Sequence, residues 1–235
     1  GLRGKDVLLV FVESYGQMAV EGTSFSPGID DVVNTGTRQL QADGFSSRSG
    51  WLTSSTYGGG SWLAHATLQS GVWVDTPRRY SELIASKRLT LTAAFRRAGW
   101  RTVADVPATH GSWPEAHSFY HFEKIWDRDN LGYHGPRFGF STMPDQYALQ
   151  ALQKLELAKR NRRPVFSEID LTSSHTPWTR IPPLISWTKL GNGSIFNRRP
   201  IDRTGLGDSQ QGYARSIKYA LRALYEFVER YGNKN

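Results

Sequence analysis

Ser61 has the local sequence that attack on a phosphoryl or sulfuryl group requires. It follows Gly58, Gly59 and Gly60 and precedes a segment with helical character. Glycines let the backbone approach a ligand closely, and the N–H groups at a helix start attract anionic oxygens. A serine hydroxyl is a poor nucleophile near pH 7 unless a metal lowers its pKa. Considered alone, Ser61 fits an ordinary N-capping serine at least as well.

Two further candidates directly follow apolar segments. Glu13 closes the run DVLLVFVE, and His175 follows the run VFSEIDL within the sequence SHTPW. In open α/β sheets, ligands collect at the carboxyl ends of the strands. A carboxylate there can hold a divalent cation, and a histidine can bind metal or donate to an oxyanion. Each residue also has an ordinary interpretation, as a loop acid and a loop histidine.

Alternating strands and helices would position these residues. The expected helices cover residues 26–43, 61–70, 92–98, 141–161 and 212–231, and the expected strands cover 6–13, 45–55, 101–106 and 165–171. The continuous apolar run at 6–13 is typical of a central strand in a parallel sheet. The alternation predicts an α/β fold, a three-layer α/β/α sandwich with a mostly parallel central sheet. The long segment 172–210 is expected to be a loop, and loops of this length inside a domain are usually functional or mobile.

Composition narrows the class of protein. The absence of cysteine excludes disulfides, thiolate zinc sites and a cysteine nucleophile. The net charge of +8 fits attraction to anionic lipids or phosphorylated substrates, and equally a solvated basic surface. The basic residues are scattered without a recognition motif, so no nucleic-acid partner is expected. No segment approaches the roughly 20 apolar residues that span a bilayer.

The order and spacing of the motifs resemble the alkaline phosphatase/sulfatase superfamily, and within it the lipoteichoic acid synthase-like phosphoglycerol transferases. The matching segments are VLLVFVES, SSTYGGGSWLAHATLQSG and LTSSHTPW. The resemblance implies an alkaline-phosphatase-like fold with Glu13 as a metal ligand. It implies that Ser61 is both nucleophile and metal ligand, and that His175 contacts the substrate phosphate. The implied cofactor is a divalent ion, namely manganese, magnesium or zinc.

This sequence departs from the family patterns at three places. Sulfatases have proline two residues and arginine four residues after the nucleophile, where Leu63 and His65 stand here. Ser61 is therefore expected to remain unmodified. Trp113 matches an aromatic residue that grips the transferase substrate, but Glu115 stands where an arginine is expected. The family's Asp-His pair after the last helix is absent, so a single domain at 1–235, incomplete at its C-terminus, is expected to bind metal weakly and to be inactive alone.

The resemblance implies a metal-dependent, sulfatase-like hydrolase or transferase acting on phosphorylated or sulfated small-molecule, lipid or glycan substrates. It also implies a place at the cell membrane, with the domain on the extracellular or periplasmic side behind N-terminal helices that this sequence lacks. Two alternatives stay open. One is a true sulfatase, which would carry formylglycine at Ser61. The other is a non-catalytic domain of the same fold that binds a glycan or an anionic lipid.

Overall fold

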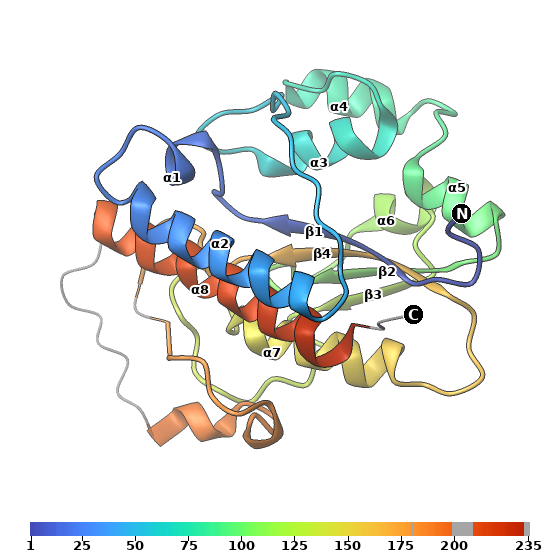
Figure 1. The fold of residues 1–235 in the computed structure, drawn as a ribbon. Helices are drawn as coiled ribbons and strands as arrows, with labels where there is room; N and C mark the ends of the chain where they lie inside the picture. Colours follow the sequence, from blue (N-terminus) through green and yellow to red (C-terminus); the bar gives the residue numbers. More distant parts are fainter. Residues whose placement is uncertain (180, 199–208, 233–235) are drawn as a thin grey trace.

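The computed structural model describes residues 1–179, 181–198 and 209–232, and its centre is a sheet of parallel strands (Figure 1). The strands are β1 (Val7–Val12), β2 (Arg101–Val106), β3 (Lys124–Asp127) and β4 (Val165–Leu171). Their order in the sheet is β1-β4-β2-β3, and every neighbouring pair is parallel. Helices cover both faces of this sheet (Figure 1). The predicted three-layer α/β/α sandwich is therefore confirmed.

The helices fall into two layers. One layer contains α3 (Ser61–Ser70), α4 (Pro77–Ile84), α5 (Leu91–Arg97) and α6 (Pro114–Ser118). The other contains α7 (Asp145–Leu152), which continues into the π-helical turn η1 (Gln153–Leu157), α8 (Gln210–Tyr231), α2 (Ser26–Ala42) and the short α1 (Gln17–Val20). Two short 3-10 helices, η2 (Trp187–Lys189) and η3 (Ser194–Arg198), lie in the long segment before α8. No helix in the described ranges is both long enough and apolar enough to cross a bilayer.

Side chains of β4 show how the sheet separates two hydrophobic cores. Phe166 packs with the cluster beneath α3 and α5, whereas Ile169 and Leu171 pack with the cluster beneath α7 and α8. Successive residues of a strand point to opposite faces, so a strand between two helical layers is apolar on both sides. This double burial explains the continuous apolar runs in the sequence.

The position of β1 differs from the prediction. It was expected at the centre of the sheet, but it lies at one edge of the sheet that the structure describes, and all six of its residues are half-buried. Leu9 packs toward the α3 layer, and Val10 packs toward the α7 and α8 layer. An edge strand covered on both faces has the same apolar composition as a central one. For this reason the apolar run at residues 6–13 wrongly predicted a central position.

Four other segments also differ from the expectation. Residues 45–55 form no strand, and most of them are exposed. The helix expected from residue 141 begins at Asp145, because Pro144 at its N-cap disfavours helical geometry in the preceding residue. The sequence analysis did not anticipate β3 or α4, although Thr76 and Pro77 form an ordinary helix start at α4.

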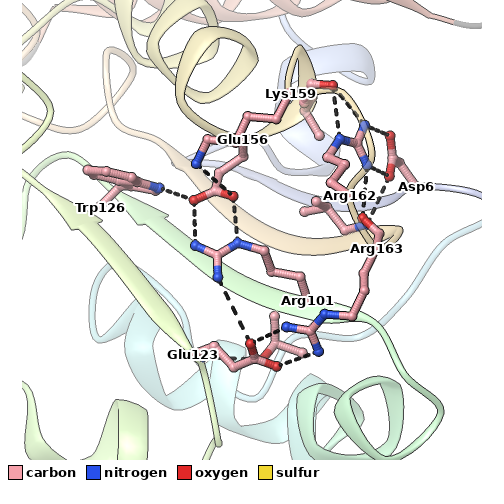
Figure 2. Close-up of polar contacts among 11 residues, drawn as sticks. Asp6, Arg101, Glu123, Trp126, Glu156, Lys159, Arg162 and Arg163 are labelled. Carbon is pink, nitrogen blue, oxygen red and sulfur yellow. Dashed lines mark hydrogen bonds and ion pairs between the residues drawn. The ribbon is translucent and has the colours of Figure 1, made fainter.

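An ion-pair network joins the amino ends of the strands (Figure 2). The closest pairs are Arg162–Asp6 at 2.6 Å, Arg101–Glu156 at 2.6 Å and Arg163–Glu123 at 2.6 Å. The fully buried Glu156 carboxylate also accepts a hydrogen bond from the Trp126 indole at 2.9 Å. The network connects the segment before β1 with the segment before β4, and thereby holds this edge of the sheet together.

Candidate active site

Ser61 is the first residue of α3, as the sequence predicted. Gly58, Gly59 and Gly60 before it all have positive φ, at 71°, 154° and 70°. Only glycine adopts such a run of conformations without strain. Gly60 is the N-cap, and no side chain of the described chain caps this helix start. The first turn of α3 therefore has the character of an anion site.

Glu13 and the loop that carries His175 meet at the carboxyl edge of the sheet. The Glu13 N–H donates to the Leu171 carbonyl at 3.0 Å, and the Ser174 hydroxyl donates to the Glu13 carbonyl at 2.5 Å. The half-buried His175 ring stacks on Phe140, with ring centroids 3.6 Å apart. The structure thus brings these two candidates to one edge, while their chemical roles stay predictions.

One turn after Ser61, His65 meets two acids of β4. Its Nδ1 atom lies 3.7 Å from Glu168 Oε1 and 3.7 Å from Asp170 Oδ1. Both acids face α3 because residues i and i+2 of a strand share a face. The His65 ring also stacks on Phe11, with centroids 3.7 Å apart. The sequence analysis did not single out this cluster, although two acids at alternate positions of an otherwise apolar strand were the available signal.

Burial and like charges shape the electrostatics of this cluster. Burial, followed by the charge of Asp170, raises the pKa of Glu168 to about 7. Burial, followed by the charge of Glu13, raises the pKa of Asp170 to about 7 as well. Burial lowers the pKa of His65, although Glu168 and Glu13 act in the opposite direction. Glu13 is therefore within electrostatic range of both His65 and Asp170.

A pocket of about 340 Å³ opens beside the cluster, and His65, Glu168 and Asp170 line part of it. The aromatic side chains in its wall are Trp62, Tyr80, Trp113 and Tyr120. Trp113 is half-buried, and its ring lies 5.7 Å from that of Tyr120. Trp113 thus packs against core residues and also lines the pocket, and its contact with a substrate stays a prediction.

The donor types at this edge suit a divalent cation. Carboxylate oxygens, a serine hydroxyl and an imidazole are ligands for manganese, magnesium or zinc. Among the residues that the structure describes, the buried Oδ1 atom of Asp170 has no hydrogen-bond donor. A buried carboxylate oxygen without a donor is uncommon, and a bound cation would satisfy it. The residues present therefore fit the metal that the family resemblance implies.

Comparisons with known proteins agree with this architecture. No family model and no curated protein matches the sequence. The solved lipoteichoic acid synthase LtaP from Listeria monocytogenes has a TM-score of 0.62 and 17% identity, and the match covers 97% of this chain and 52% of that one. The phosphoglycerol transferase GacH from Streptococcus pyogenes, in complex with sn-glycerol-1-phosphate, has a TM-score of 0.58 and 18% identity, covering 98% and 58%.

These likenesses define the class of fold. The chain has a sulfatase-like α/β domain, and within that class its architecture is that of the lipoteichoic acid synthase-like structures. The predicted alkaline-phosphatase-like fold is confirmed. The chain spans about half the length of the solved chains that it matches.

Proposed function

We propose that this domain is the catalytic part of a metal-dependent phosphotransferase or phosphohydrolase with Ser61 as its nucleophile. The observation that carries the proposal is the position of Ser61 at a helix start preceded by three positive-φ glycines, one turn from a pocket-lining cluster at the carboxyl edge. The fold of GacH, a transferase solved with sn-glycerol-1-phosphate, supports a phosphorylated substrate.

The proposed reaction has two steps. In the first, Ser61 Oγ loses its proton and bonds to phosphorus, the bond from phosphorus to the leaving alcohol breaks, and that alcohol takes up a proton. In the second, an acceptor alcohol or water loses its proton and bonds to phosphorus, the bond from phosphorus to Ser61 Oγ breaks, and Ser61 Oγ takes up a proton. The N–H groups at the start of α3 and the His175 side chain stabilise the phosphoryl oxygens. A divalent cation held by Glu13 and Ser61 would lower the hydroxyl pKa and offset the phosphoryl charge.

The substrate is proposed to be a phosphorylated lipid, glycan or small molecule of the cell envelope, met on the outer side of the membrane. The net charge of +8 supports contact with anionic lipids. Trp113 is proposed to contact the alcohol part of the substrate from the pocket wall. Glu115 lines the same pocket, and its carboxylate would repel a second phosphate group there.

The test is Ser61→Ala in the full-length protein, assayed with manganese and bis-nitrophenyl phosphate. We expect turnover to fall by at least about a thousandfold, because removal of a nucleophile leaves only the binding contributions. Ser118→Ala, which removes an exposed hydroxyl that donates to the Pro114 carbonyl on α6, is the matched control and should retain activity. Unchanged turnover in Ser61→Ala would remove Ser61 from the mechanism and contradict the proposal, whereas absence of turnover in the parent protein would favour the non-catalytic binding domain.

A mass measurement on the peptide that contains Ser61 separates the sulfatase alternative. We expect unmodified serine, and a phosphoserine after brief reaction with substrate. Formylglycine at this position would instead support sulfate-ester hydrolysis.

A further inference from the structure

His65, Glu168 and Asp170 converge from two elements that are fixed in the fold. Each offers one donor atom, and the three atoms all lie within 4.8 Å of one another. We propose that these residues are the ligands of a divalent transition-metal ion, a site that none of the sequence motifs assigns. The inference does not depend on whether Ser61 catalyses phosphoryl transfer, since its ligands differ from Glu13 and Ser61.

The spacing of the donor atoms matches a shared ion better than direct hydrogen bonds. The distance from His65 Nδ1 to each carboxylate oxygen is 3.7 Å, longer than the roughly 3.2 Å limit of a good hydrogen bond. Two ligand atoms that each lie about 2.1 Å from one ion are roughly 3.4 Å apart at the tetrahedral angle. Small side-chain movements would therefore bring all three atoms to bonding distance.

The carboxylates in this cluster have no cationic side chain facing them in the described part of the chain. Gln69 donates its amide to Glu168 Oε2, which leaves Oε1 directed at His65. Asp170 Oδ1 is buried without a hydrogen-bond donor. The His65 imidazole offers its Nδ1 atom to both carboxylates, and imidazole nitrogen is a common metal ligand. A cation between these groups would offset the charge of the two buried carboxylates.

Surrounding residues hold the ligands in place, as is usual around metal sites. Phe11 stacks on the His65 ring and limits its rotation. The Gln69 side chain that binds Glu168 is itself held, because its Oε1 accepts from the Thr92 N–H and from the Thr92 hydroxyl, both at 3.0 Å. Ions can enter from the pocket that these ligands line, where the Asp170 side chain is 23% exposed.

The ligand types select the kind of ion. One imidazole nitrogen and two carboxylate oxygens suit zinc or manganese, whereas calcium and magnesium prefer oxygen ligands alone. The sequence analysis predicted weak metal binding because it considered Glu13 and Ser61 as the metal ligands. The three-ligand cluster leads to the opposite expectation, that the chain by itself binds one zinc or manganese ion.

Calorimetric titration of the chelator-treated chain with zinc chloride or manganese chloride tests the proposal. We expect one ion per chain, and binding weakened by about a hundredfold or more in Asp170→Asn and in Glu168→Gln. Glu82→Gln, which removes an acid from an exposed helix pair, and Ser118→Ala are the controls and should bind like the parent chain. Loss of binding in Glu13→Gln and Ser61→Ala with retention in Asp170→Asn would place the ion on the catalytic pair, which overturns the inference and leaves the proposed function standing. Absence of tight binding in the parent chain would overturn it as well.

A spectroscopic measurement avoids dependence on variants that fail to fold. Pulsed electron paramagnetic resonance of manganese bound to the parent chain should show coupling to a directly bonded nitrogen, because His65 is a ligand. The coupling should persist in His175→Ala and in His110→Ala, which remove histidines that follow β4 and β2 at this edge. Glu13 and Ser61 offer only oxygen, so a manganese signal without nitrogen coupling would overturn the assignment.

Discussion

The amino ends and the carboxyl ends of the strands form two edges of the central sheet. Both edges carry buried carboxylates, but the groups that face these carboxylates differ. At the amino edge, the buried Glu156 carboxylate meets the Arg101 guanidinium at 2.6 Å (Figure 2). At the carboxyl edge, the buried Glu168 carboxylate meets the Gln69 amide and the His65 ring, and no guanidinium or ammonium group of the described residues faces it. Burial would raise both pKa values, but hydrogen bonds from Arg101 and Trp126 hold that of Glu156 below its usual range. The pKa of Glu168 instead rises to about 7.

This difference separates a structural role from a functional one. A buried acid that pairs with an arginine has its charge offset within the folded chain, and its role is to connect segments. A buried acid without one lowers stability, and such groups gather where a ligand supplies the missing charge. Asp105 of β2 adds to the contrast, because neither of its oxygens has a hydrogen-bond partner in the described ranges. The same kind of substitution should therefore have opposite effects at the two edges.

The largest effect is expected for Glu156→Gln at the amino edge. The change should lower the free energy of unfolding by about 3 kcal/mol, because it leaves the Arg101 charge without its buried partner. Urea denaturation at pH 7 with chelator present measures this. Glu82→Gln is the control, since Glu82 pairs with Arg78 at 2.9 Å on an exposed helix surface and should contribute less than about 0.5 kcal/mol. Equal effects of the two substitutions would contradict the structural role of the amino edge.

A gain in stability is expected for Glu168→Gln at the carboxyl edge. The native pKa of Glu168 is about 7, above that of an unfolded glutamate, so the native state favours the protonated form. The acid therefore destabilises the fold as the pH rises through 7, and a neutral amide avoids this cost. We expect the free energy of unfolding of the variant to exceed that of the parent chain by about 1 to 2 kcal/mol at pH 8 with chelator present.

The pH dependence is the control for that gain. At pH 5 the native Glu168 carboxyl is already protonated, so the difference between the variant and the parent should shrink. A destabilised variant at pH 8 would show that the Glu168 charge is compensated in the fold after all.

Local sequence patterns predicted much of this fold. The runs that became β2 and β4 were recognised because each is a short run of mixed apolar and polar residues that follows a break in the chain, at Gly99 and at Pro164. Gly71 and the triple glycine marked both ends of α3. The edge position of β1 was not predictable, because strand order depends on pairing between distant segments. The strand β3 was missed because its four residues, KIWD, are too few to show a period.

The candidate site was only partly visible in the sequence. Ser61, Glu13 and His175 were found because they stand next to glycines or at strand ends. Glu168 and Asp170 lie inside a strand, and their significance depends on which helix covers that face. Only the packing of α3 on β4 brings His65 to them, and a contact between residues so distant in sequence leaves no local pattern.

The smallest effect is expected for Asp6→Asn at the amino edge. Its dependence on low pH tests the difference between the two edges. Burial would raise the pKa of Asp6, but the hydrogen bonds from Arg162 and from the Val165 N–H hold it below its ordinary value. A lowered native pKa stabilises the fold above the unfolded pKa near 4, and this contribution is lost as the pH falls through the native value. The Asp6 side chain is 33% exposed, so solvent screening limits the loss at pH 7 to about 1 kcal/mol.

Urea denaturation of Asp6→Asn and of the parent chain at pH 7 and pH 3 measures this difference, with the exposed Asp129→Asn as the matched control. As the pH rises from 3 to 8, Asp6→Asn should become increasingly less stable than the parent chain, whereas Glu168→Gln should become increasingly more stable than it. The opposite signs follow from the guanidinium that faces Asp6 and from the lack of one facing Glu168 among the described residues. If rising pH shifted the stability of both variants relative to the parent in the same sense, the contrast between the two edges would be wrong.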